Sequence, residues 1–304
     1  MTVRGLKADI AQRKRHDRWF AALGLLATSV GILTLLALLI DLAMDGAGRL
    51  SFSFFANFPS RFPEKAGVLS AWVGTAVVML VTALAAVPLG VAAGLYLEEY
   101  APKNRITTLI EINIANLAGV PSIVYGLMAL GVFVYGLHLG QSVLTAGLTL
   151  ALLILPIVIM ATREAIRTIP ASIREAAFAV GATKWQMVRH HILPYSAGGI
   201  LTGVIIGLSR AIGESAPLIT VGALTFIAFL PPAPVVGKFP FLSFEWLTSP
   251  YTVLPIQLFN WVSRPQKAFH LNAAAAGLIL MGMTLAMNAA AIAIRYRFRK
   301  RIKW

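Results

Sequence analysis

Long apolar stretches alternate with short polar segments along most of this 304-residue chain. A helix of about 20 apolar residues is long enough to cross the roughly 30 Å hydrocarbon core of a bilayer. Six stretches approach or exceed that length, and the pattern therefore predicts an all-α membrane protein with six transmembrane helices in one domain, residues 19–294. The predicted spans lie at about residues 19–42, 71–96, 112–137, 143–162, 197 onward with an interruption at Pro217, and 272–294.

The third span contains a helix-breaking residue near its middle. Pro121 removes one backbone hydrogen bond from a helix, so we expect the span to be bent or broken there. Asn116, Ser122 and Tyr125 surround this position and are candidates to lie near a pathway. Polar side chains within spans more often join helices than bind a substrate, so a structural role is favoured for these three.

The composition agrees with a lipid-embedded chain and excludes several classes of function. Hydrophobic residues make up 58% of the sequence and charged residues 12%, about half the charged share of soluble domains. The net charge of +14 would suggest a nucleic-acid partner in a soluble protein. Here the basic residues flank the apolar spans, so topology and anionic membrane lipids explain them and no nucleic acid is expected. The absence of cysteine excludes disulfides and thiol catalysis.

The distribution of Lys and Arg predicts the orientation in the membrane. Six spans put both ends of the chain on one side, which then holds 19 basic residues, whereas the other side holds six. The positive-inside rule makes the richer side cytoplasmic and places loop 231–270 outside. We therefore expect a multi-pass protein of the cytoplasmic (inner) membrane with both termini in the cytoplasm. The predicted cytoplasmic parts are residues 1–18, 98–111, 163–196 and 295–304.

Segment 163–196 is too polar to span a membrane and too apolar to remain free in water. Two capping-box patterns, S-x-x-E from Ser172 and T-x-x-Q from Thr183, predict two short amphipathic helices. Gly181 can end the first in a left-handed conformation, and Pro194 is expected to stop the second. Physical reasoning alone leaves two roles open: helices lying on lipid headgroups, or a surface that docks a partner.

Two charged residues lie within the fifth span. Arg210 and Glu214 are four residues apart, which would put them on one helix face. A charge at mid-bilayer costs about 2.5–3.5 kcal/mol, so such residues are normally paired or line a cavity. A self-neutralising pair that locks spans together is one reading. We favour the other, in which Arg210 meets an anion in a substrate pathway and Glu214 holds it meanwhile, with Ser209 and Ser215 as supporting candidates.

The remaining polar residues offer no catalytic constellation. Glu98, Glu99 and Glu111 are interpreted as solvated or headgroup-facing charges. The sequence has no G-x-x-x-x-G-K-[ST] loop to cradle ATP, so we expect no cofactor in this chain and no enzyme activity of its own. The histidines are not spaced as a metal set; we considered His138, His190, His191 and His270.

One motif in segment 163–196 resembles the cytoplasmic loop of bacterial ABC importer permeases. The motif is EAAxxxG followed by LP, here Glu175, Ala176, Ala177, Gly181, Leu193 and Pro194. In that family the loop docks into a cleft of the ATPase subunit, which implies a docking role for these residues and for Trp185. The family usually has an aliphatic residue where this chain has His191. We interpret that departure as a tolerated rim position or a source of mild pH sensitivity.

Further stretches resemble the phosphate importer permeases, and the PstA-type subunit in particular. They are YLEEYAPKNR, IEINIANLAGVPSIVYGL, SRAIGESAPL and QLFNWVSRP. The resemblance implies a type I ABC importer permease fold with cytoplasmic coupling helices, and a substrate pathway that includes Arg210 and Glu214. It also implies inorganic phosphate as the substrate.

The same resemblance implies four kinds of partner. They are a homologous PstC-type permease, an ATPase dimer that holds ATP and Mg, an extracytoplasmic phosphate-binding protein, and membrane lipids. The nearest alternative is a permease for another oxyanion, sulfate or molybdate. A stand-alone channel or a membrane-embedded enzyme would belong to a different class; a channel would conduct without an ATPase, and an enzyme would need a catalytic set.

Overall fold

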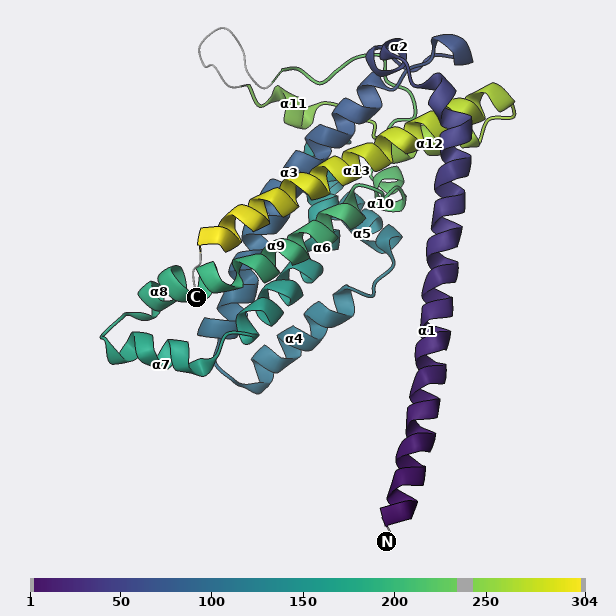
Figure 1. Ribbon diagram of the computed structural model, residues 1–304. Helices are drawn as coiled ribbons and strands as arrows, with labels where there is room; N and C mark the ends of the chain where they lie inside the picture. Colours follow the sequence, from purple (N-terminus) through teal and green to yellow (C-terminus); the bar gives the residue numbers. More distant parts are fainter. Residues whose placement is uncertain (1–2, 234–242, 302–304) are drawn as a thin grey trace.

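The computed structural model describes residues 3–233 and 243–301, so parts of the predicted outer loop and of both tails lie outside the described residues. Within those residues every regular element is helical (Figure 1). The α-helices are α1 (Val3–Gly46), α2 (Phe52–Ala56), α3 (Leu69–Leu95), α4 (Arg105–Leu117), α5 (Ser122–Ala129), α6 (Val143–Arg167), α7 (Ala171–Ala179), α8 (Lys184–Met187), α9 (Leu193–Ala211), α10 (Ala216–Thr220), α11 (Glu245–Thr248), α12 (Leu254–Val262) and α13 (Lys267–Arg301).

Five helical stretches of the described chain are long and apolar enough to cross a membrane. A sixth span exists if α4 and α5 with its continuation are one broken segment, bent by 106° at the break. The break lies between Leu117 and Ser122, where Pro121 precedes the first residue of α5. The predicted interruption of the third span at Pro121 is confirmed.

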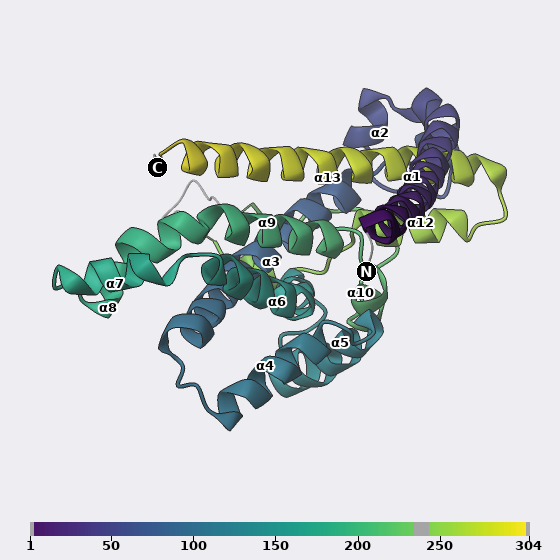
Figure 2. The same ribbon diagram turned by 60° about the horizontal axis from the view of Figure 1, so that its bottom comes forward.

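Helices α3, α6 and α9 form the centre of the bundle, and α13 lies across α9 and α12 (Figures 1 and 2). Small residues let these helices approach closely: a Cβ atom on Gly94 of α3 would lie 2.7 Å from Thr162 of α6. Leu150, Ile154 and Val158 of α6 fill the interior. We call the end of the bundle that carries α7 and α8 the docking end, and the opposite end, with α2 and α12, the far end.

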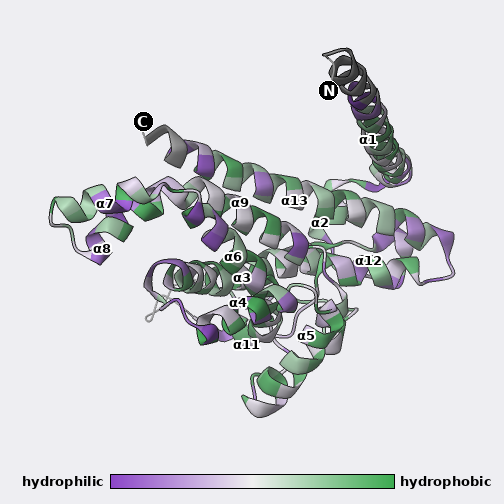
Figure 3. Ribbon diagram, turned by 90° about the horizontal axis from the view of Figure 1, so that it is seen from below, coloured by the Kyte–Doolittle hydropathy of each residue, from purple (hydrophilic) through white to green (hydrophobic). Residues whose placement is uncertain are grey.

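Helix α1 touches the rest of the chain near its far end and stands clear of the bundle along most of its length (Figure 1). Gly46 packs closely on the backbone of Ala274 and Ala275 in α13. The large apolar side chains between Trp19 and Met44 are mostly exposed. Figure 3 shows hydrophobic residues on outward-facing turns of α1 and α5, which lipid or another membrane subunit must cover.

The hairpin of α7 and α8 differs in two respects from the sequence prediction. Ser172 does not cap α7, because the helix begins at Ala171 after Pro170 and Ser172 already lies in the first turn. Pro194 does not end the second helix, because a wide π-helical turn, Val188–Ile192, leads directly into α9. The wide turn shifts the hydrogen-bond ladder, so a proline without an N–H group is accommodated at the second position of α9.

Two other predictions for this hairpin are confirmed. Thr183 and Gln186 form the reciprocal capping box: the Thr183 hydroxyl accepts from the Gln186 backbone, and the Gln186 side chain accepts from the Thr183 backbone at 2.8 Å. Gly181 has a φ of +81°, a left-handed conformation that a residue with a Cβ adopts only under strain. The capping box and the left-handed glycine together fix the turn between α7 and α8.

Candidate functional site

Arg210 and Glu214 form an ion pair where α9 ends. Helix α9 stops at Ala211, so Glu214 does not share the helix as predicted but lies in the turn before α10. The Glu214 backbone N–H donates to the Ala211 carbonyl at 3.2 Å, and this turn brings the carboxylate back to Arg210. The Arg210 Nε to Glu214 Oε1 distance is 3.4 Å, a long contact. The Arg210 side chain is 40% exposed and Glu214 18%, so the guanidinium retains free donors toward the open side.

The two serines beside this pair have other surroundings. The Ser209 hydroxyl bonds to the Asn288 side chain of α13 at 2.7 Å, which ties α9 to α13. Ser215 precedes α10, and its side chain makes no capping hydrogen bond there. The structure therefore brings together two of the four predicted pathway residues, Arg210 and Glu214, and gives Ser209 a structural partner.

The broken span lies close to Arg210. The Tyr125 hydroxyl donates to the Leu117 carbonyl at 2.7 Å, which joins α5 to the end of α4 across the break. Helix α5 packs on α10, which begins two residues after Glu214, so the broken span and the Arg210–Glu214 pair share one region of the molecule. Asn116 is exposed and Ser122 half-buried. Of the polar residues around Pro121, Tyr125 thus has the helix-joining role that the sequence favoured.

Gly126 provides a close contact between α5 and α10. A Cβ atom there would overlap Thr220 and lie 2.7 Å from the Pro217 Cα. Gly126→Val is therefore expected to destabilise the protein by about 1–3 kcal/mol, the usual cost of overpacking. Thermal unfolding of the purified protein in detergent measures the effect. Gly131→Val is the matched control, because Gly131 lies in the same span with open space around it; equal midpoints for both variants would contradict the close contact.

A segment of the far-end loop covers α10. Tyr251 is buried, and its hydroxyl lies 3.4 Å from the Leu218 carbonyl. Its own carbonyl accepts from the Leu224 N–H at 3.0 Å. Burial raises the pKa of the Tyr251 phenol, so this ring stays neutral. The segment around Tyr251 therefore packs directly on α10, the short helix that follows Glu214.

The hairpin of α7 and α8 has an inner face, packed against the rest of the chain, and an exposed outer surface. Ala177 is buried with Met187, Val188 and Ile192 against the end of α6. The outer surface presents large apolar side chains to the surroundings, namely Phe178, Val180 and Trp185, the last 56% exposed. Of the predicted docking residues, Glu175, Ala176, Gly181 and Trp185 are exposed, Leu193 and Pro194 are half-buried at the start of α9, and Ala177 faces inward.

An ion-pair cluster near the hairpin was not predicted from the sequence. Glu98, Glu99 and Glu111 are not solvated or headgroup-facing charges, because each pairs with an arginine of α6 or α7. The sequence does contain a hint of these pairs. Three arginines, spaced four and seven residues apart, lie on the same predicted side of the membrane as the three glutamates. The cluster consists of Arg163–Glu98, Arg163–Glu111, Arg167–Glu98 and Arg174–Glu99, with Glu164 also on Arg167.

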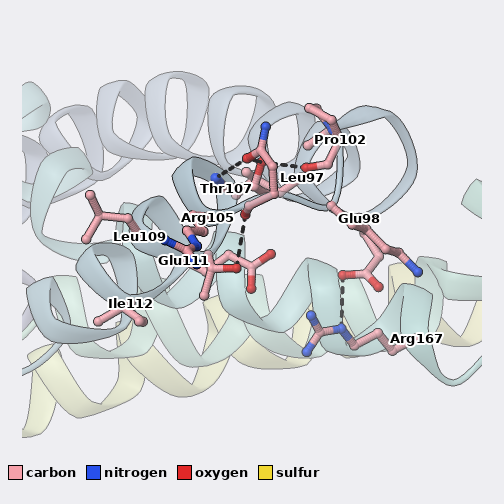
Figure 4. A pocket seen from close by; sticks show the side chains of 13 residues that line it. Leu97, Glu98, Pro102, Arg105, Thr107, Leu109, Glu111, Ile112 and Arg167 are labelled. Carbon is pink, nitrogen blue, oxygen red and sulfur yellow. Dashed lines mark hydrogen bonds and ion pairs between the residues drawn. The ribbon is translucent and has the colours of Figure 1, made fainter.

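A cavity of about 700 Å3 adjoins this cluster, and Arg210 is not among the residues that line it. In Figure 4 the Arg167 and Glu98 side chains on one side of it point toward each other, and their Nε to Oε2 distance is 2.9 Å. Its walls mix cations, carboxylates and apolar groups of the segment from Leu97 to Ile112. Among the described residues, no three His, Asp or Glu side chains are grouped so that they could hold a metal ion.

Comparisons with known proteins agree on one class of protein. Residues 86–304 match the family described as binding-protein-dependent transport system inner membrane component. The chain is 30% identical to the phosphate transport system permease protein PstA 1 of Mycobacterium tuberculosis, with 84% of this chain and 78% of that protein covered. It is 31% identical to the phosphate transport system permease protein PstA of Haemophilus influenzae, with 79% and 85% covered.

A solved structure confirms the fold. The chain is similar, with a TM-score of 0.64, to a chain of a bacterial ABC transporter involved in the import of the acidic polysaccharide alginate. The match covers 96% of this chain and 98% of that one at 16% sequence identity. The arrangement of helices is therefore that of a type I ABC importer permease.

Proposed function

The chain belongs to the family of binding-protein-dependent transport system inner membrane components, and we propose that it carries inorganic phosphate past Arg210. It is a multi-pass membrane protein and the permease component of an ABC importer, not itself the catalytic part. The relatives that match over most of the chain are phosphate permeases, which favours phosphate over sulfate or molybdate.

The observation that carries the site assignment is the partly free guanidinium of Arg210. Its contact with Glu214 is long, and 40% of the side chain is open at the end of α9. A guanidinium presents a planar pair of donors that matches two phosphate oxygens, and it keeps its proton when it is desolvated. Glu214 balances the charge while no anion is bound, so phosphate can replace it as the partner of Arg210.

The proposed orientation places the docking end in the cytoplasm, and the proposed transport cycle depends on that placement. With that end in the cytoplasm, the exposed face of α7 and α8 lies where ATPase subunits can bind. Closure of the ATPases, which hold ATP and Mg, pushes on this hairpin and shifts the spans between two states of access. Arg210 stays between the two openings.

An importer permease of this family works with ATPase subunits and a substrate-binding protein. We assign three further features to this complex: a homologous PstC-type permease as the second membrane subunit, a phosphate-specific binding protein at the far end, and an ATPase dimer at the hairpin. The exposed apolar surfaces of α1 and α5 are large enough to need cover from the second permease or from lipid.

Uptake by the purified complex in proteoliposomes tests the substrate. We expect ATP-dependent uptake of labelled phosphate that unlabelled phosphate suppresses and that a large excess of sulfate or molybdate leaves nearly unchanged. Competition by sulfate or molybdate as strong as that by phosphate would reassign the substrate. When this chain is reconstituted alone, we expect no ion flux. Measurable flux would indicate a channel and not a subunit of an importer.

A further inference from the structure

Two adjacent carboxylates connect different helices at the docking end. Glu98 and Glu99 lie on a wide π-helical turn, Tyr96–Tyr100, that continues α3. Glu98 pairs with α6 through Arg163 at 3.5 Å and Arg167 at 2.9 Å. Glu99 pairs with Arg174, which belongs to α7. One turn of the chain therefore links the central bundle to the hairpin.

The link between the hairpin and this turn is geometrically strict. The Arg174 guanidinium donates to Glu99 Oε1 from Nη2 at 2.7 Å and from Nε at 3.0 Å. It also donates to the Ile169 carbonyl at 2.8 Å and the Ile166 carbonyl at 3.2 Å, at the C-terminal end of α6. The Glu99 side chain is only 6% exposed, so water screens the pair weakly. Two of these four contacts hold α7 to the turn that continues α3, and two hold it to carbonyls at the end of α6.

A second link runs from the same cluster to the broken span. The Arg163 guanidinium, almost fully buried in α6, lies 2.6 Å from Glu111 Oε1. Glu111 belongs to α4, whose end at Leu117 is joined to α5 by the Tyr125 hydroxyl. Helix α5 in turn packs on α10 through Gly126.

The last step of this series reaches the substrate site. Helix α10 begins two residues after Glu214, so a change in the angle between α4 and α5 moves the carboxylate that holds Arg210. Each step is a packed contact, a hydrogen bond or an ion pair between helices, and Pro121 supplies the hinge.

We propose that Glu98, Glu99, Glu111, Arg163 and Arg174, which we call the ion-pair relay, transmit movement of the docking hairpin to the hinge at Pro121 and so to the Arg210–Glu214 pair. The proposal rests on the proposed function, because it requires ATPases that move the hairpin. The relay residues are positioning residues: in this structure none of them contacts the Arg210 site directly.

The test compares hydrolysis with transport in the complete complex. Glu99→Gln and Glu111→Gln each remove one charge with little change in shape. We expect both variants to assemble with the ATPases and to hydrolyse ATP within about two-fold of the unmodified complex, because ATP is bound by the partner subunits. The number of phosphate ions moved per ATP is expected to fall by about ten-fold, as the hairpin moves without turning α4.

Two further variants separate coupling from folding. Glu164→Gln is the matched control, since Glu164 is exposed and pairs with Arg167, which bonds to Glu98 but is not itself a relay residue. In this variant the number of phosphate ions moved per ATP should not change. Glu99→Asp keeps the charge and should restore part of the ratio. An unchanged ratio in both glutamine variants, or loss of assembly in every relay variant, would overturn the proposal and leave the ion pairs as structural bonds. Failure of the unmodified complex to move phosphate would instead count against the substrate.

Discussion

Replacing Arg210 with Gln is expected to lower phosphate uptake by about 100-fold or more while the complex still assembles. A hydrogen bond to a charged group contributes about 1.5–3 kcal/mol, and a guanidinium can offer two to one phosphate. Losing about 3 kcal/mol corresponds to somewhat more than a factor of 100. The fold should tolerate the change, because the side chain is 40% exposed and its contact with Glu214 is long. Initial uptake rates in proteoliposomes measure the effect.

Two control variants make this result specific. Arg210→Lys keeps the charge but loses the planar fork, so uptake should fall by about ten-fold, between the unmodified protein and Arg210→Gln. Arg295→Gln removes an arginine from the neighbouring helix α13, where its guanidinium bonds to the Thr202 hydroxyl at 2.9 Å. Uptake should remain within about two-fold, because Arg295 is not one of the proposed pathway residues. Near-normal uptake by Arg210→Gln in an intact complex would remove Arg210 from the pathway.

The sequence was most informative where one local rule decides the structure. Apolar length predicts the spans because the bilayer thickness fixes how many residues a helix needs. Pro121 predicts the break because it lacks an N–H group whatever surrounds it. Thr183 and Gly181 predict the hairpin turn for equally local reasons, a side-chain cap and a left-handed backbone. Each of these features appears in the structure.

The sequence was less informative where distant partners decide. Pro194 predicts a helix end, but the π-helical turn before it lets the helix continue. Glu99 has the local features of a surface charge, and its partner Arg174 is 75 residues away. Ser209 is next to Arg210 in sequence, yet it faces Asn288 of α13. Local patterns do not encode which helices become neighbours, so these contacts could be assigned only from the fold.

The docking motif also combines residues whose surroundings are set by the fold and not by the local sequence. Its residues all lie within the short segment 175–194, yet Ala177 packs inward against α6 while Trp185 faces outward. A bulky substitution at Ala177 is therefore a poor probe of docking, because it disturbs the packing of the hairpin itself. Exposed residues of the outer surface give a cleaner test, since their loss leaves the internal contacts of α7 and α8 unchanged.

Replacing Trp185 with Asp is expected to weaken ATPase binding by about 30-fold or more. An aromatic side chain buried at an interface commonly contributes at least about 2 kcal/mol, which corresponds to about 30-fold in affinity. Trp185 is 56% exposed in this chain and lies beside the turn at Gly181, so it is free to enter a partner cleft. Co-purification and titration of the ATPase subunits in detergent measure the loss.

The matched control replaces an equally apolar residue at the far end. Phe52 of α2 is 88% exposed, and Phe52→Asp adds the same charge away from the hairpin, so ATPase binding should not change. Equal losses in the two variants would indicate a general effect of the added charge on assembly. Retained binding in Trp185→Asp would show that the hairpin lies on lipid headgroups, the alternative that physical reasoning left open, because an aspartate there would weaken membrane contact but not the ATPase complex.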